Sequence, residues 1–241
     1  MHTGPQPPQT PSGFSLTRHW LLFFNLCIGL YVTLPILAPV FMHLGLTRPA
    51  RLIYTVYSPM CHQMAFRSFF LYGEQTTYPR QQAHVAGLTP FEAYSQDLTE
   101  FSGIQADDWP SFFLAARRFL GNSEMGYKMA LCERDISIFG ALLAGGLVYA
   151  VLRRRRPVPP LPLLWFVLLG MLPIGLDGFS QLFGYYGLSV PVVGRIFSLR
   201  ESPPLLRSLT GAWFGLCVAW LALPNIELSL RDLKPPKPPS G

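Results

Sequence analysis

The chain is poor in charged side chains. Asp, Glu, Lys and Arg make up 13% of its 241 residues, whereas soluble domains average about 25%. Hydrophobic residues make up 50% of the chain and are concentrated in long blocks rather than spread evenly. This composition argues against an ordinary soluble domain and indicates a protein that crosses a membrane several times.

Signatures of common enzymes and of nucleic-acid binding are also missing. The chain has no glycine-rich phosphate loop, no Gly-x-Ser-x-Gly elbow and no His-Glu-x-x-His pair. Its net charge of +6 is distributed over loops and chain ends, and no basic stripe alternates with aromatic residues as nucleic-acid binding would favour. We therefore expect the lipid bilayer, and no nucleic acid, as a partner.

Four apolar blocks are long enough to span a bilayer, because about 20 apolar residues cross the hydrocarbon core. They predict an all-α membrane protein with a four-helix transmembrane bundle. The predicted spans are residues 19–44, 136–152, 161–185 and 205–223. In the last span, Gly211 and Gly215 form a Gly-x-x-x-Gly pair suited to close helix packing.

The composition changes between the first and second spans. Residues 74–127 contain Gln, Thr, Glu and Asp together with helix-start signals, which predicts an extramembrane insert with short helices. Residues 1–15 and the basic, Pro-rich residues 226–241 are expected to be disordered tails, because they offer little apolar surface. The transmembrane domain then covers residues 16–225.

One charged residue, Asp177, lies inside the third apolar block. A charge at the centre of a membrane helix costs about 2.5–3.5 kcal/mol, so we expect this carboxylate to be paired. Gln181 lies one turn further along the same helix face. We predict that Arg134 or Arg207 is the partner of Asp177.

The number of spans places polar residues from four separate parts of the chain on one side of the membrane. These residues form the candidate functional cluster: Cys61, His62, Gln63, Arg67, Cys132, Arg134, Asp177, Gln181, Glu201, Ser202 and Arg207. The four arginines at 153–156 favour a cytoplasmic loop between the second and third spans. Both termini are then expected in the cytoplasm and the cluster on the outer face.

The motifs in this cluster resemble a known family. They are Cys61-His62-Gln63 with Arg67, Leu131-Cys132-x-Arg134 before a glycine-rich span, Leu176-Asp177-Gly178-x-x-Gln181, and Glu201-Ser202 with Arg207. In this order, over about residues 55–222, they are similar to the bacterial predicted membrane proteins called domain of unknown function 2085. The resemblance implies a multi-pass protein of the bacterial cell membrane and brings no known reaction.

The chain departs from that family at two places. The long insert replaces what is usually a short link. Asp135-Ile136-Ser137 stands where many members carry Cys-Thr-Gly, which argues against a ligand set that needs this extra cysteine.

The sequence leaves several functions open, and whether the protein is an enzyme is one of the open questions. Cys61, His62, Cys132 and Asp177 offer the ligand types of a zinc-like divalent metal. With a water as a further ligand, such a site would support metal-dependent hydrolysis, with an arginine holding an anionic substrate group. Alternatively, Cys61 and Cys132 form a disulfide on an oxidising outer face. The intramembrane Asp177 also fits a small transporter or accessory subunit, acting with a membrane-protein partner or a second copy of the chain.

Overall fold

The computed structural model describes residues 16–232, and the remaining residues of the predicted tails lie outside this range. Four of its helices are long and apolar enough to cross a membrane, as predicted. These spans belong to α1 (Leu16–His43), α5 (Glu133–Arg155), the segment from α6 (Leu163–Trp165) through a π-helical turn (Phe166–Met171) into α7 (Leu172–Ser189), and α9 (Pro204–Asp232).

Of the helix ends that differ from the prediction, two have a clear structural cause. Helix α5 begins three residues earlier than expected, because the Cys132 sulfur accepts a hydrogen bond from the Asp135 backbone N–H and caps the first turn. Helix α9 continues to Asp232, so residues 226–232 are helical rather than part of a disordered tail. This extension is held to α5 because the Glu227 carboxylate accepts a hydrogen bond from the Tyr149 hydroxyl at 2.6 Å.

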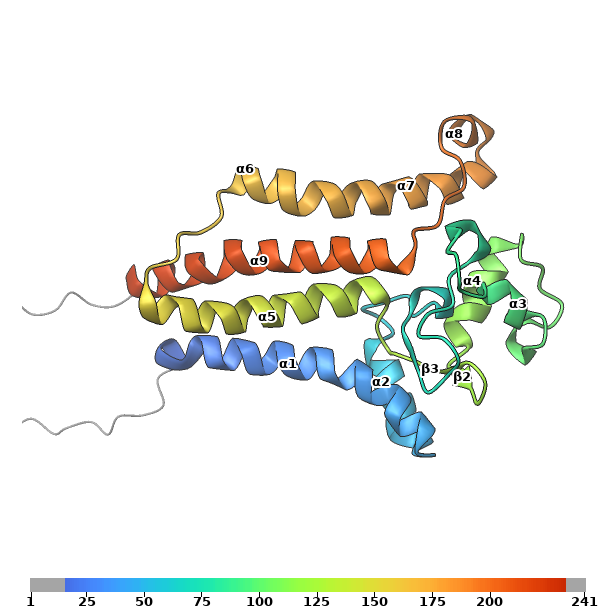
Figure 1. Cartoon of the computed structure of the whole chain (residues 1–241), viewed down its shortest axis with the longest axis horizontal. Coiled ribbons are helices and arrows are strands. Elements are labelled where there is room, and N and C mark those ends of the chain that lie inside the picture. The colour runs from blue at the N-terminus through green and yellow to red at the C-terminus, as the bar shows by residue number, and fades with distance from the viewer. Residues whose placement is uncertain (1–15, 233–241) are drawn as a thin grey trace, which may run out of the picture.

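The four spans lie side by side in the order α1, α5, α9, α7, as Figure 1 shows. The closest pair is α5 and α9. A Cβ added at Gly215 of α9 would lie 2.2 Å from the Ile138 carbonyl oxygen of α5, and one at Gly211 would lie 2.7 Å from the Arg134 carbonyl oxygen. The predicted Gly-x-x-x-Gly pair therefore lets the two backbones touch, and it brings the first turn of α5 against Gly211 of α9.

The insert packs at one end of this row of helices (Figure 1). The packed region is wider than the predicted residues 74–127 and takes in the whole connection from α1 to α5, which is called the insert from here on. Its helices are α2 (Thr47–Tyr57), α3 (Phe91–Ser95) and α4 (Trp109–Arg118), with short 3-10 turns at Ala65–Arg67, Gln81–Ala83 and Thr99–Phe101. A further short helix, α8 (Pro191–Ile196), follows α7.

The insert also contains a small antiparallel sheet that the sequence did not predict. Strands β1 (Phe70–Leu71), β2 (Gly121–Asn122) and β3 (Gly126–Lys128) pair in the order β1-β3-β2. Strands of two or three residues are too short to show the alternation that identifies a strand in a sequence.

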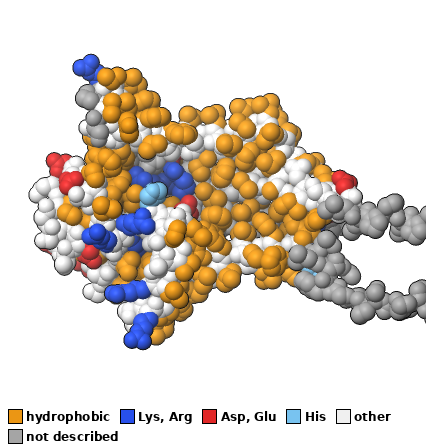
Figure 2. Space-filling view, turned by 180° about the vertical axis from the view of Figure 1, so that it is seen from behind, with side chains coloured by type: hydrophobic (Ala, Val, Ile, Leu, Met, Phe, Trp, Pro, Cys, Tyr) orange, Lys and Arg blue, Asp and Glu red, His pale blue; other side chains and the backbone are white. Residues whose placement is uncertain are grey.

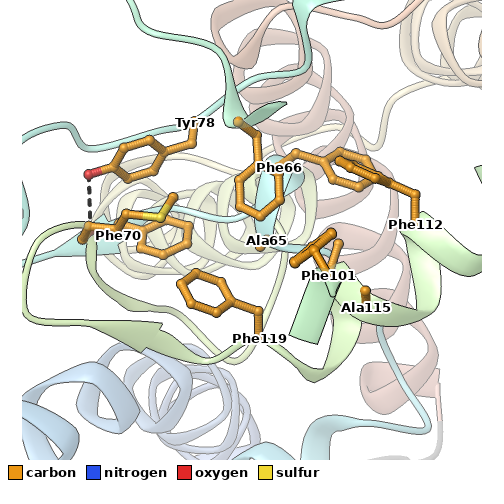
Figure 3. Packing of buried hydrophobic residues seen from close by; sticks show 11 residues of the cluster. Ala65, Phe66, Phe70, Tyr78, Phe101, Phe112, Ala115 and Phe119 are labelled. Carbon is orange, nitrogen blue, oxygen red and sulfur yellow. Dashed lines mark hydrogen bonds between the residues drawn. The ribbon is translucent and has the colours of Figure 1, made fainter. Parts of the chain in front are cut away.

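Aromatic side chains form the core of the insert (Figure 3). The fully or nearly fully buried rings are those of Phe66, Phe70, Tyr78, Phe91, Phe112 and Phe119. The Tyr78 hydroxyl donates to the Met125 carbonyl oxygen at 3.1 Å, which satisfies the one polar atom of the ring. Phe66 therefore anchors the end of the segment that precedes it in this core.

Lys128 holds the segment that precedes Phe66 through hydrogen bonds to backbone carbonyl oxygens. Its side chain is fully buried, and its ammonium donates to the carbonyl oxygens of Gln63, Ala116 and Arg117. Three acceptors match the three donors of an ammonium group. The Gln63 side chain in turn donates to the Ala130 carbonyl oxygen at 2.9 Å. The segment that carries Cys61, His62 and Gln63 is thus fixed beside the start of α5.

Candidate functional site

A cavity of about 590 Å³ lies between the insert and the adjoining ends of the spans. Most of the predicted cluster lines it: Cys61, His62, Gln63, Arg67, Cys132, Arg134, Gln181 and Arg207. The insert adds the aromatic rings of Trp109 and Phe113, and α7 adds those of Tyr185 and Tyr186. Residues from four distant parts of the chain therefore meet at one cavity with mixed polar and aromatic walls, as the number of spans predicted.

Two cysteines and one aspartate meet at the wall of this cavity. The ligand atoms of Cys61, Cys132 and Asp135 all lie within 4.8 Å of one another. The Cys132 backbone N–H donates to the Cys61 sulfur at 3.3 Å, and the Cys132 thiol donates to Asp135 Oδ2 at 3.1 Å. Both cysteines are free thiols in this structure.

The contact between the two cysteines shifts their pKa values in opposite directions. A hydrogen bond from Cys132 lowers the pKa of the Cys61 thiol, against the opposing effect of burial. The same contact, together with burial, raises the pKa of Cys132 well above its usual range. Of the two thiols, Cys61 therefore has the lower pKa, and the thiolate is the form that binds metals.

Asp177 is buried, and its carboxylate is bound by partners other than the two cysteines. Arg134 forms an ion pair with its Oδ2, as predicted, while Arg200 lies 3.3 Å from its Oδ1. The Ser202 hydroxyl donates to Oδ1, and the Gln181 amide lies 3.3 Å from Oδ2. Both carboxylate oxygens are thus occupied by protein donors.

Glu201 is the centre of a second buried network. Arg67 binds its carboxylate through two parallel hydrogen bonds, of 2.7 Å from Nε and 2.9 Å from a terminal nitrogen. Arg207 and the Tyr185 hydroxyl also donate to it. Burial raises the pKa of Glu201, but Arg67 and Arg207 outweigh that effect, so the net pKa is lowered. The same pairing raises the pKa of Arg67 in spite of its burial.

Arg207 does not pair with Asp177, although the sequence made it a candidate. Its guanidinium contacts Glu201 and, at 3.3 Å, Glu133. The Nε atoms of Arg207 and Arg134 are buried and have no hydrogen-bond partner within residues 16–232. Both side chains also line the cavity.

The structure brings together only part of the metal-ligand set predicted from the sequence. Cys61 and Cys132 meet, and His62 is exposed on the wall of the same cavity. Asp177 stands apart from the sulfur pair because Arg134, Arg200 and Ser202 hold its carboxylate.

Sequence reasoning missed Asp135 and Arg200. Asp135 was visible only as a carboxylate three residues after Cys132 at a helix start, a spacing that places both residues on one side of the first turn. Arg200 lay in a loop rich in arginine, and nothing in its spacing separated it from its neighbours.

Four candidate spans, with a cavity at one end of the bundle, define a multi-pass membrane protein. The family model described as "Predicted membrane protein (DUF2085)" matches residues 123–221, which confirms the resemblance drawn from the motifs. The chain is also similar to the uncharacterized protein MJ1492 of Methanocaldococcus jannaschii. That relative is 24% identical over 214 residues, covering 87% of this chain and 93% of its own length. No solved structure matches the chain.

Proposed function

We propose that this membrane protein binds a zinc-like divalent metal ion through Cys61, Cys132 and Asp135, at the wall of the cavity that faces the insert. The observation that carries the proposal is the convergence of three ligand atoms within 4.8 Å from two distant segments. Thiolate and carboxylate are both zinc ligands, and three protein ligands with one open position are typical of zinc sites that receive a further ligand.

Asp135 explains how the chain keeps a third ligand without a third cysteine. The family that it resembles often carries Cys at this position. Here the Asp135 carboxylate lies 3.1 Å from the Cys132 sulfur, so an oxygen ligand takes the place of a sulfur. His62 lines the same cavity and is exposed, and we infer that it or a bound ligand completes the coordination.

Three arginines indicate which class of ligand would fit at the open coordination position of the metal. Arg67, Arg134 and Arg207 line the cavity beside the sulfur pair, and guanidinium groups match carboxylate and phosphate oxygens. An anionic group is therefore the ligand class that fits next to the metal.

Metal analysis of the purified full-length protein tests the proposal. The double variant Cys61→Ser/Cys132→Ser should lose nearly all of its zinc, because the remaining carboxylate is a weak site alone, while the wild type should hold about one zinc per chain. Cys27→Ser/Cys217→Ser is the matched control, since these two cysteines lie in α1 and α9 away from the cavity, and it should retain the wild-type zinc content.

The same samples separate the metal from a disulfide. In the metal-bound protein, removing zinc with a chelator should expose two additional thiols to a maleimide without any reductant. If these thiols react only after reduction and no zinc is present, Cys61 and Cys132 form a bridge and the metal proposal is wrong.

We also infer that the protein lies in a bacterial cell membrane with both termini in the cytoplasm, so that the cavity opens on the outer face. The positive charge of residues 153–156 supports this orientation. In intact cells, a membrane-impermeant maleimide should label Gly87→Cys in the insert. It should not label Arg156→Cys beyond α5. Labelling of Arg156→Cys alone would show the reverse orientation.

A further inference from the structure

A second cavity, of about 500 Å³, lies between α2 and α4 on the insert. Unlike the first cavity, it is lined by basic side chains without any acidic one. Arg51 of α2 and Arg117 and Arg118 of α4 line it, and its lining contains no acidic residue. Among the ion pairs within residues 16–232, none involves these three arginines. Figure 2 shows basic side chains at the end of the molecule that carries the insert, beside the apolar surface of the helices.

The contacts of α2 place this cavity at the level of the membrane surface. Helix α2 packs back along α1, where Ala38 and Ala50 are both completely buried in one cluster. At its other end, the Tyr57 hydroxyl donates to the Tyr31 carbonyl oxygen at 2.7 Å. Tyr31 also packs on Phe139, which lies about 9 Å along α5 from Glu133 at 1.5 Å per residue. Helix α2 therefore packs alongside the ends of α1 and α5 and does not extend beyond them away from the membrane.

The exposed side of α2 is apolar next to its arginines. Leu52 and Val56, one turn apart, are 65% and 53% exposed, and Met60 is 61% exposed. Leu114 of α4, which also lines the cavity, is exposed as well. A helix with an apolar face beside a basic one is the pattern of a segment lying in the membrane interface.

From these observations we propose that Arg51, Arg117 and Arg118 bind the phosphate headgroup of an anionic phospholipid, whose acyl chains lie against Leu52, Val56 and Leu114. Three guanidinium groups without acidic partners match a phosphate. The exposed apolar side chains favour a lipid over free phosphate, because inorganic phosphate would leave them in water. Arg117 also donates to the Ser58 carbonyl oxygen at 3.0 Å, which fixes one guanidinium in place.

Lipid binding to the full-length protein in a neutral detergent, followed by native mass spectrometry, tests this proposal. The probes are phosphatidylglycerol, phosphatidylcholine with the same acyl chains, and inorganic phosphate as a competitor. The wild type should bind phosphatidylglycerol in preference to phosphatidylcholine, and inorganic phosphate at equal concentration should not displace it.

The double variant Arg51→Gln/Arg118→Gln should bind phosphatidylglycerol about tenfold more weakly, because each basic side chain near a membrane surface contributes to the attraction of anionic lipid. Arg117 is left unchanged because it also holds the chain at Ser58. The matched control is Arg48→Gln/Arg195→Gln, which removes the same charge at exposed positions outside the cavity and should bind like the wild type.

Three results would overturn the proposal. Equal loss of affinity in the control would show attraction to overall charge rather than a site. Equal binding of phosphatidylcholine would show that anionic lipid is not selected. Displacement by inorganic phosphate at equal concentration would show a site for free phosphate instead of a lipid headgroup.

Discussion

Replacing Glu201 with glutamine is expected to lower the free energy of unfolding by about 3–5 kcal/mol, because it leaves buried arginines without their counter-charge. The Glu201 side chain is completely buried. It holds Arg67 and Arg207 together and accepts a hydrogen bond from Tyr185. Glutamine has nearly the same shape, so the loss would measure charge rather than volume. Thermal unfolding in detergent, followed by tryptophan fluorescence, would report it.

Glu124→Gln is the matched control, since that exposed side chain takes part in no ion pair within the described part of the chain, and it should leave the unfolding temperature unchanged. A second variant distinguishes electrostatics from packing. Adding Arg67→Gln to Glu201→Gln removes one unpaired charge and should recover part of the loss. If the loss of unfolding free energy in the double variant equals the sum of the losses in the two single variants, Arg67 and Glu201 are not coupled.

The direction of the Glu201 pKa shift adds a pH dependence. Because the pKa in the folded protein is lowered from 4.5, the stability that this carboxylate contributes is fully present above about pH 4.5. It is lost as the pH falls through the lower folded-state pKa. The difference in stability between the wild type and Glu201→Gln should therefore persist down to about pH 4.5 and shrink below it.

Asp177→Asn is the second large effect that we expect, again a loss of about 3–5 kcal/mol. The substitution leaves Arg134 and Arg200 without the carboxylate that both contact. Asp97→Asn, an exposed change in the insert, should have no measurable effect when the two variants are compared in the same unfolding assay. Equal tolerance of both substitutions would refute a buried, paired Asp177.

The two arginine partners of Asp177 should not contribute equally. The Arg134 side chain is 23% exposed and that of Arg200 is 40% exposed, so solvent screens the Arg200 pair more strongly. Arg134→Gln should therefore destabilise the protein more than Arg200→Gln. A reversed order would mean that the loop carrying Arg200, and not the start of α5, holds Asp177 in place.

Much of the fold could be predicted because each membrane span is a single continuous apolar segment of the sequence. Apolar length alone identified α1, α5, the α6–α7 segment and α9. Counting spans then placed Cys61, Cys132 and Asp177 at one end without any knowledge of contacts. The cost of a lone intramembrane charge predicted that Asp177 has a partner, and Arg134 was one of the two candidates that the sequence named.

What could not be predicted depends on contacts between distant segments. The small sheet forms because the aromatic core around Phe66 brings β1 and β3 together, and neither strand is long enough to show a pattern. Asp135 joins the sulfur pair because Cys132 caps α5 and the Cys61 segment is held beside it by Gln63 and Lys128. The sequence shows the spacing of Cys132 and Asp135 but not the approach of Cys61.

The proposed metal site is tested most directly by X-ray absorption spectroscopy at the zinc edge of the purified full-length protein. The expected spectrum has two sulfur neighbours at about 2.3 Å and nitrogen or oxygen neighbours at about 2.0–2.2 Å. Cys61→Ser should remove one sulfur from the shell. A zinc shell of nitrogen and oxygen alone, unchanged by Cys61→Ser, would contradict a metal held by Cys61, Cys132 and Asp135.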